Sequence, residues 1–447
     1  SQEATGGLGD PANNNAFTSA VYNSRIYVGT YNNNGLEIYS YDGENWVEEV
    51  GGGPAGSSTA PGFGDPNNLK AESMLVYGGQ LYVGTANPIT GCEVWRYNGV
   101  SWTQVVGAGP GASIGPGFGD PNNWNASSMA VYGIQLYVGT FNWIAGCEIW
   151  AFDGASWTPL VGADPSALVG PGFGTACVVA ESMQVFLTDL YVGTGSPVGG
   201  EVWRYDGAGW TPLVSADPAA PVGIGFGDVN NTDVMEMAVF GGSLYVGTQN
   251  WNTGCEVWAF DGASWTQLVG SQPSAIQPPG FGTPDNGAAR RLEVFDSRLF
   301  VGTENNNGCR VYYYDGTYWV LEVGAGGLGT YEAAGFGDPN NVAVASAAIF
   351  NNRLFLATTN MATGCDVFAL KSSTTWYLAE GATAGGFETW VLVQNPNPHP
   401  ANVTLTFQTG TGPVVGPTDV IPPNSRRSYL VDGYVDTFDV STQVVSD

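Results

Sequence analysis

Basic residues are scarce in this sequence. Only 12 Lys and Arg stand against 40 Asp and Glu, which gives the 447-residue chain a formal net charge of −28 at pH 7. Binding to nucleic acid requires clustered Lys and Arg that neutralise phosphates, and an anionic membrane surface attracts the same residues. The charge balance therefore argues strongly against a nucleic-acid partner and disfavours a membrane surface.

Long apolar runs and a leader segment are also missing. No apolar stretch is long enough to span a bilayer, and no signal peptide precedes Ser1. Charged residues make up only 12 % of the chain, whereas Gly contributes 66 residues. This composition favours a secreted bacterial protein whose signal has been removed, so we expect an extracellular or cell-surface location.

Histidine occurs once, at His399, within the sequence Asn-Pro-His-Pro, where we expect an exposed turn residue. Without further histidines, Ser-His-Asp and Cys-His catalysis and most zinc sites lose their usual base or ligand. The sequence gives no support to these classes of enzyme.

The chain does contain a long internal repeat. Units that begin with a G-F-G-D-type sequence recur at intervals of 53 or 55 residues, and a period of this size is typical of propellers and solenoids. The seven units begin at Gly7, Gly62, Gly117, Gly172, Gly225, Gly280 and Gly335.

Each repeat contains four short runs rich in Val, Leu, Tyr and Trp, without a helical period. In the second repeat these runs are Glu72–Tyr77, Gln80–Thr85, Cys92–Tyr97 and Ser101–Val106. Gly78-Gly79 and Asn98-Gly99 join them in pairs, as tight hairpins require. Such four-stranded sheets cover one another when they are arranged radially. We therefore predict an all-β, seven-bladed β-propeller over residues 7–371.

The two ends of the repeat region depart from the repeat pattern. Residues 1–6 form an N-terminal extension without a strand pattern, so we expect no N-terminal strand to complete the last blade. The seventh repeat also ends irregularly, with Ala369-Leu-Lys-Ser-Ser-Thr-Thr-Trp in place of the usual turn.

The turn before the fourth strand of each repeat contains Asp or Asn, Gly and an aromatic residue, as in Asp153-Gly-Ala-Ser-Trp157. With the V-G-T and E-V-W sequences, it resembles the Asp-box repeats of sialidase-like propellers, although Asp and Gly are adjacent here. The resemblance implies a propeller and no activity, because in that family the box lies away from the active site.

After Trp376 the repeat gives way to alternating strands with Pro- and Asn-rich turns, which predicts an Ig-like β-sandwich over residues 372–447. The sequence Trp376-Tyr-Leu-Ala-Glu-Gly, followed by Leu-Val-Gln-Asn-Pro396, resembles a module of secreted bacterial proteins. That resemblance implies one further strand, so the strand near the end would have an unpaired edge. We therefore predict assembly contacts at Asp439, Val440, Val444 and Val445, with residues 1–6 of a neighbouring copy as a candidate donor strand.

Five of the six cysteines share one position of the repeat, too far apart on neighbouring blades for disulfides. They are expected to be buried thiols, with a shared metal or redox role as the alternative. Cys177 stands outside this pattern, and Cys147–Cys177 is the one disulfide that we predict.

Acidic and amide side chains recur at two positions. Glu37, Glu93 and their equivalents are expected to stabilise the fold, although paired carboxylates also serve glycosidases. The G-F-G-D-P-N-N loops supply the oxygen donors that Ca²⁺ prefers and also the residues that stabilise turns. The possible calcium ligands are Asp10, Asp65, Asn67, Asp120, Asn122, Asp228, Asn230, Asp338 and Asn340.

Two further sets of side chains could face a ligand. Tyr31, Phe141, Trp143 and Trp251 follow the second strands, each beside an Asn, and could stack on a sugar or be buried against the next blade. Polar residues on the first strands should line the channel without forming a nucleophile with its base. They are Thr18, Ser73, Ser128, Ser182, Glu236, Arg291 and Ser346.

These observations predict a protein that is not an enzyme. The first hypothesis is an extracellular structural or adhesive protein, a subunit of a cell-surface assembly or filament that contacts itself or another surface protein through the C-terminal sandwich. The alternative is a carbohydrate-binding lectin, or a degenerate sialidase-like glycosidase, that binds glycans at the propeller face.

Overall fold

The computed structural model describes the chain except for residues 53–56, 58, 325–332, 372–373, 397–400 and 447. It confirms the all-β class, because strands alternate with only short 3₁₀ helices in these residues. The chain divides into two compact units, Ser1–Leu370 and Lys371–Asp447. We call them the ring and the C-terminal unit.

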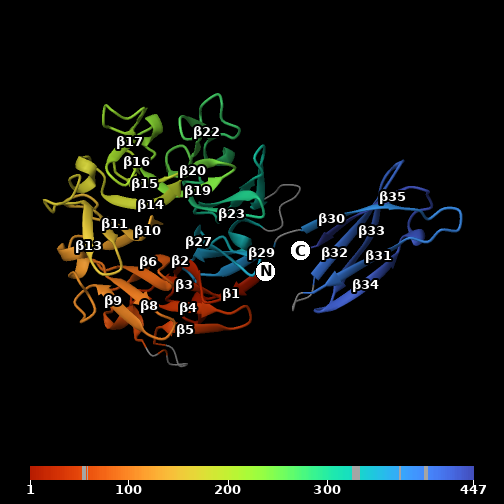
Figure 1. Ribbon diagram of the computed structural model, residues 1–447, viewed down its shortest axis with the longest axis horizontal. Helices are drawn as coiled ribbons and strands as arrows, with labels where there is room; N and C mark the ends of the chain where they lie inside the picture. Colours follow the sequence, from red (N-terminus) through yellow and green to blue (C-terminus); the bar gives the residue numbers. More distant parts are fainter. Residues whose placement is uncertain (53–56, 58, 325–332, 372–373, 397–400, 447) are drawn as a thin grey trace. The chain divides into compact units, whose positions relative to one another are not determined.

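The ring consists of seven repeats of four antiparallel strands in the described residues (Figure 1). The first strands are β2 (Asn15–Tyr22), β6 (Lys70–Tyr77), β10 (Asn125–Tyr132), β14 (Val179–Phe186), β19 (Asp233–Phe240), β23 (Ala288–Phe295) and β27 (Ala343–Phe350). The second strands are β3 (Arg25–Tyr31), β7 (Gln80–Ala86), β11 (Gln135–Phe141), β15 (Asp189–Gly195), β20 (Ser243–Gln249), β24 (Arg298–Glu304) and β28 (Arg353–Thr359).

Two shorter strands complete each repeat on its outer side. The third strands are β4 (Ile38–Tyr41), β8 (Val94–Tyr97), β12 (Ile149–Phe152), β16 (Val202–Tyr205), β21 (Val257–Phe260), β25 (Val311–Tyr314) and β29 (Val367–Lys371). The outermost strands are β5 (Trp46–Val50), β9 (Trp102–Val106), β13 (Trp157–Val161), β17 (Trp210–Ser215), β22 (Trp265–Val269), β26 (Trp319–Val323) and, in the seventh repeat, β1 (Gln2–Ala4). A short strand, β18 (Val222–Gly223), pairs with β17.

The fourteen inner strands of the described residues form one closed antiparallel ring. The sequence predicted these strands as part of a seven-bladed propeller. A single residue pair joins the second strand of each repeat to the first strand of the next, as in Tyr31↔Lys70. The last such pair, Thr359↔Asn15, closes the ring. Glycine permits this approach, because a Cβ on Gly29 would lie 2.4 Å from the Cβ of Ala71 in the next repeat.

The prediction that no N-terminal strand completes the last repeat was wrong. β1 pairs antiparallel with β29, with Gln2 opposite Phe368. Glu3 forms an ion pair with Arg353 of the seventh repeat and accepts a 3.1 Å hydrogen bond from the Tyr41 hydroxyl of the first. A strand of three residues is too short to show an alternation of apolar and polar side chains, so its pairing with β29 and not its own sequence makes it a strand. Because these residues are paired within their own chain, the prediction that they serve a neighbouring copy was also wrong.

Apolar side chains between neighbouring repeats form the core. Each of the seven interfaces has its own cluster of buried residues. The Phe of the G-F-G sequence belongs to this packing, since Phe63 stacks on Trp95 with ring centroids 4.5 Å apart. These phenylalanines lie in short 3₁₀ helices: η2 (Pro61–Gly64), η3 (Pro116–Gly119), η4 (Pro171–Gly174), η5 (Ile224–Gly227), η6 (Pro279–Gly282) and η7 (Ala334–Gly337). The equivalent helix of the first repeat, η1 (Gly7–Gly9), contains Leu8 instead.

The C-terminal unit contains two antiparallel sheets. One has the order β30 (Thr374–Gly381), β35 (Val440–Ser446), β32 (Ala401–Thr409) and β33 (Gly412–Ile421), and the other pairs β31 (Trp390–Asn395) with β34 (Ser425–Leu430). A 3₁₀ helix, η8 (Val431–Gly433), follows β34. Both sheets contribute to one core, which includes Val391, Leu405, Phe407 and Val444.

The predicted unpaired edge at the last strand is not present. β35 lies inside its sheet, paired with β30 on one side and β32 on the other. The assembly contacts predicted at Asp439, Val440, Val444 and Val445 therefore lose their basis, and the side chains of Val440 and Val444 are buried in the core. The edge strands of this sheet, in the described residues, are β30 and β33.

Candidate functional site: the loop face and the central cavity of the ring

A buried amide fixes the loops on one face of the ring. In the second repeat, Asn68 Nδ2 donates hydrogen bonds to Gly62 O at 2.9 Å and to Glu93 Oε2 at 2.8 Å. Asn68 Oδ1 accepts from Asn87 Nδ2 at 3.1 Å and from Thr85 Oγ1 at 3.2 Å. The side chain thus connects the loop before the first strand with the loop after the second. Equivalent amides that are also buried are Asn13, Asn123, Asn231, Asn286 and Asn341.

The recurring carboxylates belong to the same network. Glu93 Oε2 accepts a second hydrogen bond, from Trp95 Nε1 at 2.9 Å, and the side chain is buried. The same Trp-to-Glu bond is present at Glu148, Glu201 and Glu256. These contacts agree with the expectation that the recurring acidic residues stabilise the fold.

The aspartates of the D-P-N-N sequence accept hydrogen bonds from their own loops and from the loop after the second strand. Asp65 Oδ1 accepts from the backbone N and the Nδ2 of Asn67, both at 2.9 Å, and Asp65 Oδ2 accepts from Asn87 Nδ2 at 3.1 Å. Asp10, Asp120, Asp228 and Asp338 make equivalent contacts, and Asn122, Asn230 and Asn340 donate as Asn67 does.

This geometry supports the turn-stabilising interpretation of the D-P-N-N loops. No group of three or more His, Cys, Asp or Glu side chains that could hold a metal occurs in the described part of the chain. Calcium binding stays a prediction.

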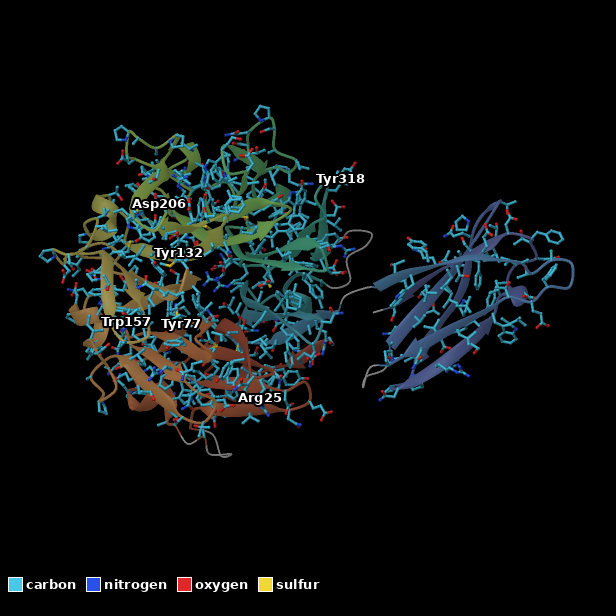
Figure 2. The ribbon with its side chains drawn as sticks, in the orientation of Figure 1. Arg25, Tyr77, Tyr132, Trp157, Asp206 and Tyr318 are labelled. Atoms are coloured by element: carbon cyan, nitrogen blue, oxygen red, sulfur yellow. The ribbon has the colours of Figure 1, made fainter. Side chains whose placement is uncertain are left out.

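The turns on the opposite face use aspartate in the same way. Asp206 Oδ1 accepts from the backbone N of Ala208 at 2.8 Å and of Gly209 at 2.9 Å, and Figure 2 labels Asp206 together with Tyr318 of an equivalent turn. These hydrogen bonds lower the pKa of the exposed Asp206 carboxyl. The Asp-box-like sequence therefore has a structural role here.

The predicted Cys147–Cys177 disulfide is not formed in this structure, where all six cysteines are free and buried. Cys177 takes the place of the buried Asn in the fourth repeat, which the sequence pattern did not reveal because the loop is one residue shorter. Its Sγ lies 3.1 Å from both Glu201 Oε2 and Thr194 Oγ1. Burial raises the pKa of the Cys177 thiol, as it does for the other cysteines.

Apolar side chains protrude from the loops that follow the second strands. Trp143 is 58 % exposed and Trp251 is 46 % exposed, although both are large and aromatic. Further exposed residues of this loop position are Ile89, Ile144, Val198 and Met361. Because these loops occupy the same end of every second strand, their apolar side chains share one face of the ring. We call it the loop face.

Both Trp143 and Trp251 pack against neighbouring residues of the ring. The Phe141 ring packs near both Trp124 and Trp143, with centroid distances of 5.7 and 6.4 Å. Trp251 lies against Gly287 of the next repeat, so closely that a Cβ there would be 2.1 Å from the indole. Both tryptophans are therefore held in defined positions, as a binding site requires.

The other predicted ligand-binding residues differ in exposure. Tyr31 and Phe141 are partly buried, and the Tyr31 hydroxyl donates to Asn33 Oδ1 at 2.8 Å. The asparagines beside these aromatics, Asn32, Asn142 and Asn250, are buried in the loop network. They are not free to bind a sugar. Exposed amides nearby, such as Asn252, remain.

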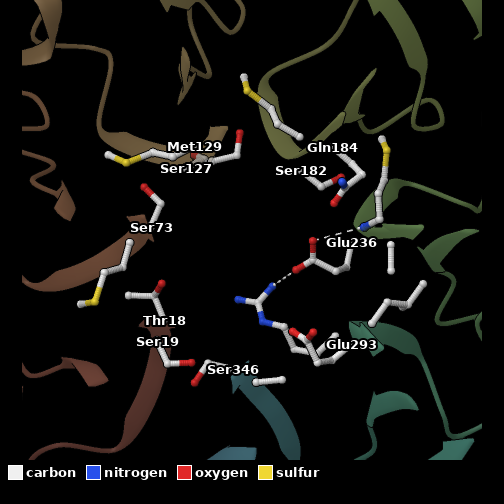
Figure 3. Close-up of a pocket in the computed structure, with 18 of the residues that line it drawn as sticks. Thr18, Ser19, Ser73, Ser127, Met129, Ser182, Gln184, Glu236, Glu293 and Ser346 are labelled. Carbon is white, nitrogen blue, oxygen red and sulfur yellow. Dashed lines mark hydrogen bonds and ion pairs between the residues drawn. The ribbon is translucent and has the colours of Figure 1, made fainter. Parts of the chain in front are cut away.

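First strands from all seven repeats line a central cavity of about 430 Å³. Its wall includes every residue that the sequence placed in the channel: Thr18, Ser73, Ser128, Ser182, Glu236, Arg291 and Ser346. Gln184 and Glu293, two positions further along their strands, also line it and were missed. Figure 3 shows Gln184, Glu236 and Glu293 on one side of the cavity and Thr18 and Ser73 on the other.

Two partly buried carboxyl groups of the first strands have raised pKa values. Burial raises the pKa of Glu293 to about 7, with a further contribution from the nearby Glu236 carboxylate. Burial likewise raises the pKa of Glu181 to about 7, with contributions from Asp233 and Glu72. Both groups are therefore partly protonated at neutral pH.

Comparisons with known proteins give no family assignment. No protein-family model matches the chain, and no curated protein matches it in sequence. The chain is similar to a solved extracellular domain of a one-component system from B. thetaiotaomicron, with 15 % identity and a TM-score of 0.49 over 93 % of this chain and 44 % of that one. It therefore spans less than half the length of that structure.

Two further solved structures resemble this chain more weakly. YCF48 from Cyanidioschyzon merolae is 10 % identical, with a TM-score of 0.46 over 82 % of this chain and 99 % of that one. The lectin SapL1, solved in complex with alpha methyl fucoside, is 16 % identical, with a TM-score of 0.38 over 69 % of this chain and 97 % of that one. These likenesses are too distant to assign a function. The resemblances to Asp-box repeats and to a C-terminal secreted module stay predictions.

Proposed function

We propose that this chain is a non-catalytic extracellular binding protein, a seven-bladed propeller that recognises glycans with its loop face. The observation that carries the proposal is the exposure of Trp143 and Trp251 on loops that a buried hydrogen-bond network holds in place. Exposed aromatic side chains on a rigid scaffold are characteristic of binding surfaces.

The chemistry of these loops fits a sugar. A tryptophan ring offers a flat apolar face for the C–H groups of a pyranose, while neighbouring amides can bond its hydroxyls. The Asn252 amide meets this need beside Trp251, since it is exposed and donates to Asn230 Oδ1 at 2.6 Å across two loops.

The cavity supports a binding role over catalysis. Ser73 and Ser128 of its wall donate their protons to backbone carbonyls of the next repeat at 2.6 Å and not to a general base. A serine nucleophile needs its proton removed by a base.

Glycan-array binding by the wild-type protein and by Trp143→Ala and Trp251→Ala variants tests this proposal. We expect discrete glycan signals that at least one substitution reduces by about tenfold or more, a loss of ~1.4 kcal/mol. Ile134→Ala is the control, because Ile134 is also exposed, at 86 %, and directly precedes β11, at the end opposite to the Trp143 loop. Silence across a broad array, or signals that both Trp variants retain, would refute the glycan proposal.

A second candidate function, self-association, rests on the C-terminal unit. Trp376 and Leu378 of the edge strand β30 are 48 % and 40 % exposed. They are paired with Val444 and Thr442, which are each 3 % exposed, so they lie on the core-facing side of the sheet. The two strands of the second sheet leave them uncovered, and a second copy of the chain could cover them.

Sedimentation of the wild-type protein and of a Trp376→Ser/Leu378→Ser variant tests this second function. Concentration-dependent assembly that the substitutions abolish would support a structural or adhesive subunit. If the wild-type protein is a monomer at all concentrations, the self-association proposal is refuted, whereas the glycan proposal is unaffected.

A further inference from the structure

The wall of the central cavity is rich in hydrogen-bond acceptors. The hydroxyls of Ser73, Ser128 and Ser182 donate to the carbonyl oxygens of Ala126, Ala180 and Val234 in the next repeat. A carbonyl oxygen can only accept a hydrogen bond, so each serine hydroxyl must use its proton in this bond. These three serines therefore present lone pairs, and no proton, to the cavity.

The Arg291 guanidinium in the cavity wall is already satisfied. Arg291 Nη1 lies 2.9 Å from Glu236 Oε2 in an ion pair, and Nη2 donates to the carbonyl of Phe17 at 3.0 Å. Its Nε donates to the carbonyl of Ala345. An anionic ligand would have to compete with all of these contacts, so the cavity is poorly suited to anions.

Glu293 supplies a charge without a counter-ion. In the described part of the chain its carboxylate has no ion-pair partner, although it lines the cavity. The other repeats have Ala, Leu or Gln at this position, namely Ala20, Leu75, Ala130, Gln184, Ala238 and Ala348. The fold itself therefore does not require a carboxylate there.

Two neutral groups add to this acceptor surface. Gln184 Nε2 donates to the carbonyl of Val185 at 3.0 Å, which leaves its Oε1 as an acceptor. Ser346, only 3 % exposed, lines the cavity, and its Oγ has no hydrogen-bond partner among the residues that the structure describes. An unpartnered buried hydroxyl costs free energy unless a ligand or water satisfies it.

We propose that the central cavity binds a small organic ammonium ion, with its N–H groups directed to Glu293, Gln184 Oε1 and the serine lone pairs. An ammonium group carries only donors and a positive charge, which complements a wall that is rich in acceptors and, in the described residues, contains the unpaired Glu293 carboxylate. The cavity volume of about 430 Å³ lies within the range of small-molecule sites. This site is distinct from the glycan-binding loop face.

Binding should depend on pH through Glu293. The pKa of this carboxyl is raised to about 7, so the group is mostly protonated at pH 6 and mostly charged at pH 8. Other charged groups of the wall are Glu236 and Arg291, which pair with each other, and Glu72, which lies 2.7 Å from Lys70. Affinity for an ammonium ion should therefore rise from pH 6 to pH 8.

Isothermal titration with 1,4-diaminobutane and with 1,4-butanediol, a neutral molecule of similar shape, tests the proposal on the full chain. We expect saturable binding of one diamine per chain at pH 8, weaker binding at pH 6 and none of the diol. Glu293→Gln should weaken the diamine affinity at least tenfold. Glu322→Gln is the matched control, because Glu322 lies on the outer strand of the same repeat and is also partly buried.

Three results would overturn the proposal: no saturable diamine binding at pH 8, equal binding of the diol, or unchanged affinity in Glu293→Gln. Weak diamine association that both Glu variants share and that salt removes would identify general attraction to the acidic chain and also refute the site. The wild-type pH comparison needs no substitution, so a variant that fails to fold leaves the test intact. Trp143→Ala should bind the diamine normally, which separates this result from the glycan proposal.

Discussion

At the residue scale, one buried amide per repeat does most to fix the loop face. Asn68 satisfies two donors and two acceptors from four other residues while fully buried. The Asn67 amide next to it is exposed and donates to Asp65. Sequence alone cannot separate the two neighbours, because both are typical turn residues.

Replacing Asn68 by Ala should therefore destabilise the ring. Removing the amide takes one donor from the buried Glu93 carboxylate, which keeps its bond from Trp95, and one acceptor from the buried Asn87 amide, which keeps its bond to Asp65. We expect a cost of about 2–4 kcal/mol in the free energy of unfolding. Chemical denaturation measures this cost. The Asn67→Ala control should lose less than about 0.5 kcal/mol. Equal losses for the two variants would contradict the proposed role of the buried amide.

The stability of the ring should also fall as the pH rises from about 4.5 to about 7. Glu181 and Glu293 hold their protons up to a pKa of about 7 in the folded chain, whereas the unfolded chain releases them near 4.5. In that window the folded state binds more protons, so raising the pH favours unfolding. Thermal midpoints at pH 5 and pH 7 measure the effect.

Glu181→Gln and Glu293→Gln should each lose less stability than the wild type between these pH values. Asp153→Asn is a suitable control, because Asp153 is exposed with a lowered pKa and Asn98 fills the same turn position in another repeat. A wild-type midpoint that does not fall between pH 5 and pH 7, or identical slopes in all four proteins, would contradict the raised pKa values.

At the scale of elements, local signals predicted the repeat well. The Gly78-Gly79 turn has positive φ angles of 56° and 74°, as the hairpin interpretation requires, and it joins β6 to β7. Long-range pairing was harder to predict. The three residues of β1 are too few to show an alternation of apolar and polar side chains. The position of β35 between β30 and β32 depends on the order of strands in the sheet, which the pattern within one strand does not reveal.

The candidate site shows the same division. The seven predicted residues of the cavity wall could be identified because they share one repeat position on the first strands. Glu293 was missed, because its position two residues after Arg291 on the same strand was the one sign that it faces the cavity. The exposure of Trp143 could not be predicted, since burial against the next repeat was equally consistent with its sequence.

Deleting residues 1–4 should weaken the ring. The deletion removes the pairing of β1 with β29 and the contacts of Glu3 with Arg353 and Tyr41, which join the seventh repeat to the first. We expect a thermal midpoint lower by on the order of 5 °C. Glu3→Gln, which keeps the strand, should lose less. Unchanged stability together with lost self-association would contradict this role and indicate a donor strand for a neighbouring copy.

At the scale of the whole molecule, three surfaces could bind a partner: the loop face, the central cavity and the uncovered side of β30. The described residues contain no helix long and apolar enough to cross a membrane. The net charge also limits the class of ligand, because a chain with a formal charge of −28 should repel acidic polymers and favour neutral or cationic ligands. Neutral glycans at the loop face and an ammonium ion in the cavity are both compatible with this charge.

Oxidative footprinting with mass spectrometry tests the central claim, glycan recognition by the loop face, most directly. The full chain is oxidised with and without the strongest glycan from the array, and protection is read at each exposed aromatic side chain. The account predicts protection of Trp143, Trp251 or both, with Ile134, Trp376 and Tyr377 unchanged. Protection confined to Trp376 and Tyr377, or unchanged oxidation of both loop-face tryptophans in the presence of a bound glycan, would contradict it.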